Sequence, residues 1–119
     1  MPQFRFTQAL TASQRDFRPL AGWQYRRVPQ QYVRGAAVSL MVNTTGAAGT
    51  VDMQLESGTQ TISQRSPIQV GGTAGVMPSR LNQEPITFRA MPGDELILSI
   101  DELAAATPTV NGIIEIEPL

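Results

Sequence analysis

AVSLMVNTTGAAGTVDMQLE, residues 37–56, is the stretch that decides the fold. Large apolar residues occupy every second position on both sides of a segment rich in Thr, Ala and Gly: Val38, Leu40 and Val42 precede it, and Val51, Met53 and Leu55 follow it. Because side chains alternate between the two faces of a strand, this period of two predicts two half-buried β-strands. The intervening Asn43 to Gly49 predicts a turn, and we expect the two strands to pair as a hairpin.

The same alternation recurs along most of the chain. Ser57-Gly58 and Pro92-Gly93 are turn sequences, and residues 59–64 are polar enough for an exposed edge strand. Further inner-face positions are predicted at Phe88, Leu96, Leu98, Ile114 and Ile116. Seven to nine short strands predict an all-β protein, an antiparallel β-sandwich or barrel of jelly-roll type.

Two further local elements are predicted, one strand near the N-terminus and one short helix near the C-terminus. Trp23 and Tyr25 are expected on one face of a strand that follows a turn at residues 20–22. Residues 101–106 are the one helix candidate, about one turn long, because Pro108 limits its extension. The 119 residues are expected to form a single β domain.

The composition argues against catalysis. The sequence holds no Cys, no His and no Lys, and all nine of its cations are Arg. Thiolate nucleophiles, the usual general base, Schiff-base lysines and the common transition-metal ligands are therefore absent. We expect a non-enzymatic protein with no catalytic residues, no cofactor and no metal.

The acidic residues do not change this expectation. Asp94-Glu95 and Asp101-Glu102 flank one predicted strand, which separates them by about 20 Å, so they cannot share an ion. We interpret both pairs as solvated. Glu115 and Glu117 share a strand face, but they lie beside little that could shelter a reaction.

Charge and aromatic residues are concentrated in one third of the sequence. Residues 1–34 carry six Arg against one Asp (+5), and residues 35–119 carry three Arg against nine acids (−6). Six of the seven aromatic residues also lie within the first 32 positions. Arg and aromatic residues are enriched at interface hot spots, so this basic, aromatic part predicts an interface. The candidates are Arg18, Trp23, Tyr25, Arg26 and Arg27.

Other interpretations of this part stay open. The basic part can fold onto the acidic part of its own chain, or it can contact a neighbouring copy. Arg beside Phe, Trp and Tyr also suits a groove for single-stranded nucleic acid, and a sugar-binding β module is a further alternative. A long loop over residues 71–82 adds Val76, Met77 and Leu81 as interface candidates, because apolar side chains there would be exposed on a monomer.

The turn chemistry of residues 19–119 resembles that of small jelly-roll proteins of bacteriophage particles, such as capsid, decoration and spike subunits. The features that carry the resemblance are Pro19-Leu20-Ala21-Gly22-Trp23, the Thr-Ala-Gly turn, Ser57-Gly58, Gly71-Gly72-Thr73-Ala74-Gly75-Val76, Pro92-Gly93-Asp94 and Val110-Asn111-Gly112-Ile113-Ile114. The resemblance supplies no functional residue. It implies a virion subunit that forms homo-oligomers and contacts other particle proteins.

We also formed an expectation about where the protein is made. No run of 18 apolar residues occurs, so we expect no membrane span. The first ten residues alternate polar and apolar side chains and lack the apolar segment of a secretory signal. We therefore expect synthesis in a host cytoplasm and a final location in the virion.

Overall fold

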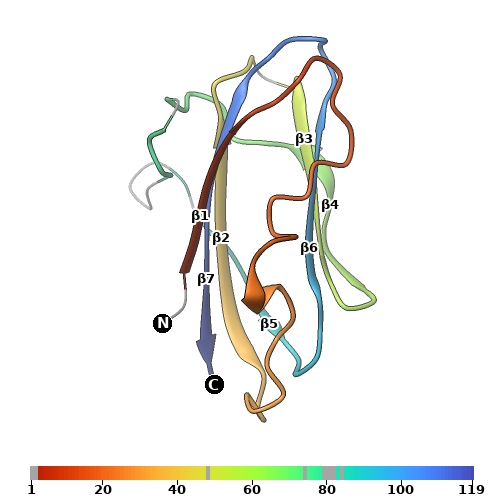
Figure 1. Ribbon diagram of the computed structural model, residues 1–119, viewed down its shortest axis with the longest axis vertical. Coiled ribbons are helices and arrows are strands. Elements are labelled where there is room, and N and C mark those ends of the chain that lie inside the picture. Colours follow the sequence, from red (N-terminus) through yellow and green to blue (C-terminus); the bar gives the residue numbers. More distant parts are fainter. Residues whose placement is uncertain (1–2, 48, 74, 79–82, 84) are drawn as a thin grey trace.

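In the part of the chain that the structure describes, seven strands form two antiparallel sheets that face one another as a β-sandwich (Figure 1). The computed structural model describes residues 3–47, 49–73, 75–78, 83 and 85–119. The strands are β1 (Gln3–Ala9), β2 (Ala36–Thr44), β3 (Val51–Ser57), β4 (Gln60–Pro67), β5 (Ile86–Ala90), β6 (Leu96–Glu102) and β7 (Thr109–Pro118). The four-stranded sheet has the order β1-β7-β2-β5, and the three-stranded sheet has the order β4-β3-β6. The predicted all-β sandwich is confirmed.

The strands pair from the two ends of the chain inward. β1 pairs with β7, β2 pairs with β5, and β3 pairs with β4, each time antiparallel. The segment between β1 and β2, residues 10–35, lies along β6, and we call it the strap. Two isolated bridges hold it there, Phe17 to Ile100 and Arg27 to Glu95. The whole chain is therefore a long hairpin that is rolled into two layers.

The core lies between the sheets and consists of alternate residues of the strands. The eleven side chains that the alternation places on the inner face all pack there: Val38, Leu40, Val42, Val51, Met53, Leu55, Leu96, Leu98, Ile114 and Ile116 are buried, and Phe88 is half-buried. The strap adds Leu10, Leu20, Trp23 and Val28 to the same core. Burial of each large apolar side chain contributes about 1.5–3 kcal/mol, so the alternation determines which face each strand turns inward.

The predicted hairpin of β2 and β3 is wrong. β2 lies between β7 and β5 in one sheet, and β3 lies between β4 and β6 in the other. The Thr-rich turn carries the chain across the sandwich, and the main-chain N–H of Thr45 donates to the Thr109 carbonyl of β7 at 3.0 Å. Both strands turn one apolar face to the shared core, whether they pair side by side or face one another. The alternation therefore cannot distinguish the two arrangements.

The expected strand at Trp23 and Tyr25 is also wrong. Residues Gln24–Arg26 form one turn of 3-10 helix, with Trp23 as its N-cap. Successive turns precede it, because Ala21 N–H donates to the Arg18 carbonyl and Trp23 N–H donates to the Leu20 carbonyl. The predicted turn at residues 20–22 is thus confirmed, and it continues into the helical turn.

No helix forms at residues 101–106. Asp101 and Glu102 end β6, and Ala105 has a positive φ of 53°, which a right-handed helix does not allow. The Glu102 carboxylate accepts the main-chain N–H groups of Ala104 at 3.1 Å and of Ala106 at 3.0 Å, so it holds this turn in a non-helical shape. It also accepts the N–H of Ser13 in the strap at 3.3 Å.

Glu102 therefore corrects a second expectation, because its side chain is buried and not solvated. Burial raises the pKa of the Glu102 carboxyl, but hydrogen bonds from the Ala104, Ser13 and Ala106 N–H groups outweigh this effect and lower its pKa below the ordinary value. The carboxylate stays ionised and joins the strap to the end of β6.

Candidate functional site

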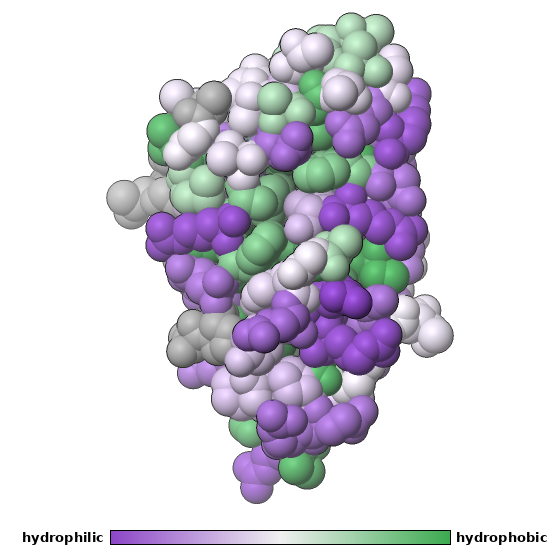
Figure 2. Space-filling view, in the orientation of Figure 1, coloured by the Kyte–Doolittle hydropathy of each residue, from purple (hydrophilic) through white to green (hydrophobic). Residues whose placement is uncertain are grey.

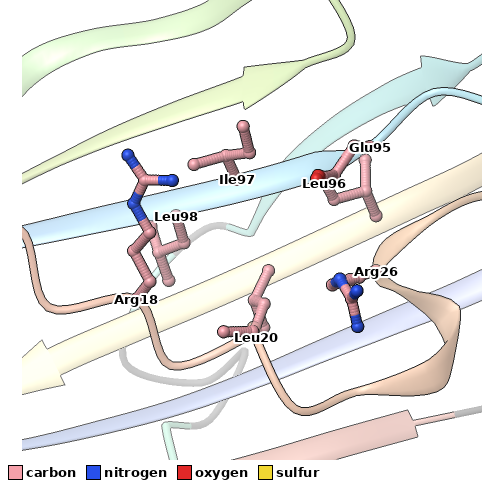
Figure 3. A pocket seen from close by; sticks show the side chains of 8 residues that line it. Arg18, Leu20, Arg26, Glu95, Leu96, Ile97 and Leu98 are labelled. Carbon is pink, nitrogen blue, oxygen red and sulfur yellow. The ribbon is translucent and has the colours of Figure 1, made fainter.

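A crevice between the strap and β6 is the candidate binding site of the molecule. It has a volume of about 70 Å³. Its lining comes from the strap (Arg18, Leu20, Ala21 and Arg26) and from the first part of β6 with the residue before it (Glu95, Leu96, Ile97 and Leu98). Figure 3 shows Arg18 and Arg26 on either side of Leu20, with β6 behind them.

The crevice exists because the strap contacts β6 at two places and stands away between them. Phe17 and Ile100 exchange two main-chain hydrogen bonds of 2.9 Å. At the other end, Val28 N–H donates to the Asp94 carbonyl at 2.8 Å. The turns at residues 18–26 occupy the interval, and these turns satisfy their own backbone groups instead of pairing with β6.

Among the described residues, the strap does not pair with β6 at Leu98. Main-chain groups of consecutive strand residues point to alternate sides, so those of Leu98 point toward the strap as those of Ile100 do. Within the part of the chain that the structure describes, no strap residue forms a main-chain hydrogen bond with Leu98. Leu20, Leu96 and Leu98 lie beneath the crevice and are almost fully buried, so its accessible surface comes from the other residues that line it.

One side of the mouth is an ordered polar network. Arg18 Nε lies 3.1 Å from Asp16 Oδ1, and Ser99 Oγ donates to the same oxygen at 2.7 Å. The hydrogen bond from Arg18, followed by that from Ser99, holds the pKa of Asp16 below its usual value. The network continues through Asp101, which accepts the Asp16 N–H at 2.8 Å and pairs with Arg65 at 3.1 Å.

The other side of the mouth carries an arginine that has no ion pair among the described residues. Arg27 Nη2 lies 3.8 Å from Glu95 Oε2. Arg26 is exposed, and it forms no ion pair with any residue that the structure describes. Three arginines (Arg18, Arg26 and Arg27) thus stand near three carboxylates, since Glu56 as well as Asp16 and Glu95 acts on Arg18.

The predicted interface residues separate into two groups in space. Arg18 and Arg26 line the crevice, and Arg27 lies beside it. Trp23 is only 7% exposed, because its ring stacks on Phe4 with 5.6 Å between centroids, and Tyr25 packs half-buried against it. Trp23 therefore supports the strap from inside and offers no contact surface of its own.

The loop candidates lie elsewhere, on the outer side of the four-stranded sheet. The buried Asn111 of β7 accepts the Gly75 N–H at 3.1 Å and donates to the Thr73 carbonyl at 3.1 Å, which anchors this loop away from the strap (Figure 1). Val76 is 57% exposed and Met77 is half-buried. Leu81 lies outside the described residues.

All seven aromatic side chains are fully or partly buried. Figure 2 shows an apolar strip on this face, bordered by hydrophilic side chains, and no aromatic ring stands free on the surface. Recognition of bases or sugar rings usually relies on such exposed rings. No aromatic side chain of the described residues therefore presents a fully exposed ring for such stacking.

Two carboxylates lie together on the four-stranded sheet. Glu115 and Glu117 border a shallow hollow of about 170 Å³ on the four-stranded sheet, where Glu115 accepts a hydrogen bond from Gln3 at 2.8 Å. No group of three or more acidic residues comes together as a metal centre within residues 3–47, 49–73, 75–78, 83 and 85–119.

No protein-family model matches the chain, and no curated protein matches it. In the described ranges no helix has both the length and the apolar character that are needed to cross a membrane.

Sequence reasoning found the arginines of the crevice but not its floor. Leu96 and Leu98 were expected in the core, where they indeed lie, and Leu20 was expected only in a turn. The available signal was the loss of period two at residues 18–26, which marks the point where the strap leaves β6.

Proposed function

We propose that the protein is a non-enzymatic structural subunit of a larger assembly of the viral-particle type, in which it makes homo-oligomeric contacts. The observation that supports this proposal is the arrangement of the side chains of the strap. Its aromatic side chains are turned inward, and its arginines are left on the surface around a small apolar crevice. Such a surface suits a contact with another protein, because arginine around an apolar seat is typical of interfaces.

The topology supports the same class. The nested pairing of the strands, with the strap in the place of an eighth strand along β6, is the arrangement of a jelly roll. Jelly rolls occur in viral capsid proteins, lectins and cupins, so the fold alone does not choose among them. The sequence lacks His for a cupin metal centre, and the surface lacks exposed rings for a sugar platform.

A cluster of exposed apolar residues at one end of the sandwich adds a further argument. Ala36 pairs with Ala90 and with Pro118, so the neighbouring Gly35 lies between Met91 and Leu119. Val33 is 82% exposed, Met91 is 50% exposed and Leu119 is 55% exposed. Large apolar side chains that gather on a surface mark a contact with another molecule.

A nucleic-acid groove is the less supported candidate. The exposed arginines can neutralise phosphates, but sequence-tolerant binding of single strands also needs rings on which bases stack. The rings of this protein pack on or in the core, either buried or partly buried.

Sedimentation velocity of the full chain at micromolar concentration tests the proposal. We expect an oligomer, and we expect that the Arg26→Ala, Arg27→Ala double variant dissociates it while the control Arg15→Ala, on the same strap, does not. Binding of single-stranded DNA and RNA at two salt concentrations should be negligible for all three proteins. A species that is strictly monomeric and joins no particle would refute the assembly role. Strong binding that falls steeply with salt would favour the nucleic-acid groove instead.

A further inference from the structure

We infer that β1 pairs along its free edge with β1 of a second copy of this chain, antiparallel about a two-fold axis at Phe6. This inference rests on the proposed assembly role and names one contact that would build the assembly. Its basis is the backbone of β1 on the side away from β7, and the lengths and charges of the strands that could pair with it.

The edge of β1 lacks the protection that the other edge strands have. The sheets end at β1 and β5 on one side of the core, and at β4 and β6 on the other. The strap is bridged to β6, β5 has only five residues, and β4 shifts register twice against β3 and ends at Pro67. A cover, a short strand, bulges and proline all hinder the pairing of an edge with another chain. By contrast, β1 keeps one register against β7 over seven residues and contains no proline.

The free main-chain groups of this edge belong to alternate residues. Leu10 N–H donates to the Pro108 carbonyl at 2.8 Å, one step beyond the last pair in the register of β1 with β7. Hydrogen-bonded pairs alternate along an antiparallel ladder, so the even-numbered residues of β1 bond to β7 and the odd-numbered residues point away from it. The outward groups are therefore those of Gln3, Arg5, Thr7 and Ala9.

These outward groups are open to an approaching strand. In Figure 1 the four-stranded sheet is seen from its β1 side, with β1 in front of β5, and the strap passes on the β6 side of β1. Arg5, Thr7, Gln8 and Ala9 are all exposed. No main-chain group of β1 pairs with a described segment other than β7, and the Ala9 carbonyl accepts only the Gln8 side-chain amide, at 3.1 Å.

The best match for this edge among the described strands is a second β1. The partner must offer an open, regular edge of similar length, which β4, β5 and β6 do not. With the two-fold axis at Phe6, Gln3 lies opposite Ala9 of the second copy and Arg5 lies opposite Thr7, so every outward group faces another outward group. An axis at Arg5 would shorten the overlap and place two guanidinium groups directly opposite each other, which is unfavourable.

The packing of Phe6 leaves room at the axis. Phe6 would lie opposite its own copy, where two rings directed at the axis would collide. The ring instead lies over Gly112 of β7, on the side away from the free edge, and Phe6 is only 9% exposed. The two four-stranded sheets would then form one continuous sheet of eight strands through an isologous contact.

A proline at position 5 tests the edge. Arg5→Pro removes an outward N–H and no hydrogen bond to β7, and Arg5→Ala, which keeps the N–H, is the matched control. Sedimentation velocity of the full chain at micromolar concentration measures assembly, and circular dichroism checks the fold. We expect Arg5→Ala to associate at least as tightly as the parent. Arg5→Pro should weaken self-association by roughly tenfold, because each copy loses one hydrogen bond to the other.

A charge exchange at position 7 tests the register without a proline. Thr7→Glu and Thr7→Arg both lose the hydroxyl that donates to Asn111 at 2.7 Å, and they differ in the charge that faces Arg5 of the second copy. Two such pairs form at each contact, so Thr7→Glu should associate roughly tenfold more tightly than Thr7→Arg. The same exchange at Gln60, an exposed residue of β4, is the control for net charge and should have a much smaller effect.

Amide hydrogen exchange reports on the bonds themselves. In the oligomer, the N–H groups of Arg5, Thr7 and Ala9 should exchange slowly, and dilution to the monomer should make them exchange fast. The N–H groups of Phe6 and Gln8, which bond to β7, should be slow in both states.

The outcomes separate this inference from the proposed function. If the parent assembles but Arg5→Pro associates like Arg5→Ala, or the two Thr7 variants associate equally, the contact lies elsewhere and the assembly role stands. Protection of the odd-numbered amides in a monomer that is bound to a different protein would assign the edge to a foreign strand and overturn the second copy as its partner. A parent that is monomeric and joins no particle would refute both the inference and the proposed function.

Discussion

Replacement of Gly112 by Ala should destabilise the sandwich, because this glycine provides the space for an aromatic ring. Gly112 of β7 lies directly opposite Phe6 of β1 in the sheet register. The ring of Phe6 covers it so closely that a Cβ atom at position 112 would fall inside the contact distance of the ring carbons. Phe6 cannot move aside freely, because it is 9% exposed and its ring lies beside that of Phe4, with 6.4 Å between centroids.

The expected magnitude follows from two opposing effects. An extra methyl group in a packed site costs about 1–3 kcal/mol. Complete expulsion of the Phe6 ring would approach the roughly 3–5 kcal/mol of a buried Phe→Ala substitution. Removal of a strand glycine returns about 0.5–1 kcal/mol. We therefore expect Gly112→Ala to lower the free energy of unfolding by about 2 kcal/mol.

Urea unfolding measures this change, and a double-mutant cycle identifies its cause. Phe6→Leu alone should be destabilising, but it should relieve the effect of Gly112→Ala. The double variant should therefore lose less unfolding free energy than the two single variants together. A neutral or stabilising Gly112→Ala, or strict additivity with Phe6→Leu, would show that the ring does not rest on the glycine.

Two other substitutions test the backbone of the sandwich. Glu102→Gln should lower the free energy of unfolding at neutral pH, because the pKa of Glu102 is depressed in the folded protein. The contribution of the Glu102 carboxylate to stability is present above the unfolded pKa of about 4.3 and is lost as pH falls through the folded pKa. The variant should therefore have a flatter acid limb in a plot of unfolding free energy against pH, and an unchanged limb would contradict the buried carboxylate. Gly35→Ala should lower the free energy of unfolding by about 2 kcal/mol or more, since Gly35 has a φ of 86° and a Cβ there would meet the Ala90 carbonyl. Thermal unfolding measures this change, and an unchanged midpoint would refute it.

The sequence predicts the inner face of the sandwich well and the connections poorly. Period two depends only on which side chains are removed from water, so residues such as Leu40 and Leu98 are found from the pattern alone. The partner of each strand depends instead on main-chain hydrogen bonds over long distances. For this reason the turn after Thr44 was interpreted as a hairpin, although it crosses between the sheets.

The candidate site shows the same limit. Arg18 and Arg26 were predicted as interface residues from their local composition, and both line the crevice. Its floor could not be predicted, because it depends on how far the strap stands from β6 between Phe17 and Arg27. The burial of Trp23 was missed as well, since a ring in a basic segment looks the same in sequence whether it faces solvent or Phe4.

The nested pairing also determines the order in which the fold can form. β3 and β4 meet through a two-residue turn, so their loop closes at a small entropic cost, whereas the pairing of Gln3 with Glu115 encloses nearly the whole chain. Folding should therefore start at the innermost hairpin, proceed slowly for a protein of this size, and reach β1 and β7 last. Pulsed hydrogen exchange should find the amides of β1 protected after those of β3. During synthesis, the first strand must then wait for its place in the sheet until β7, with which it pairs, has been made.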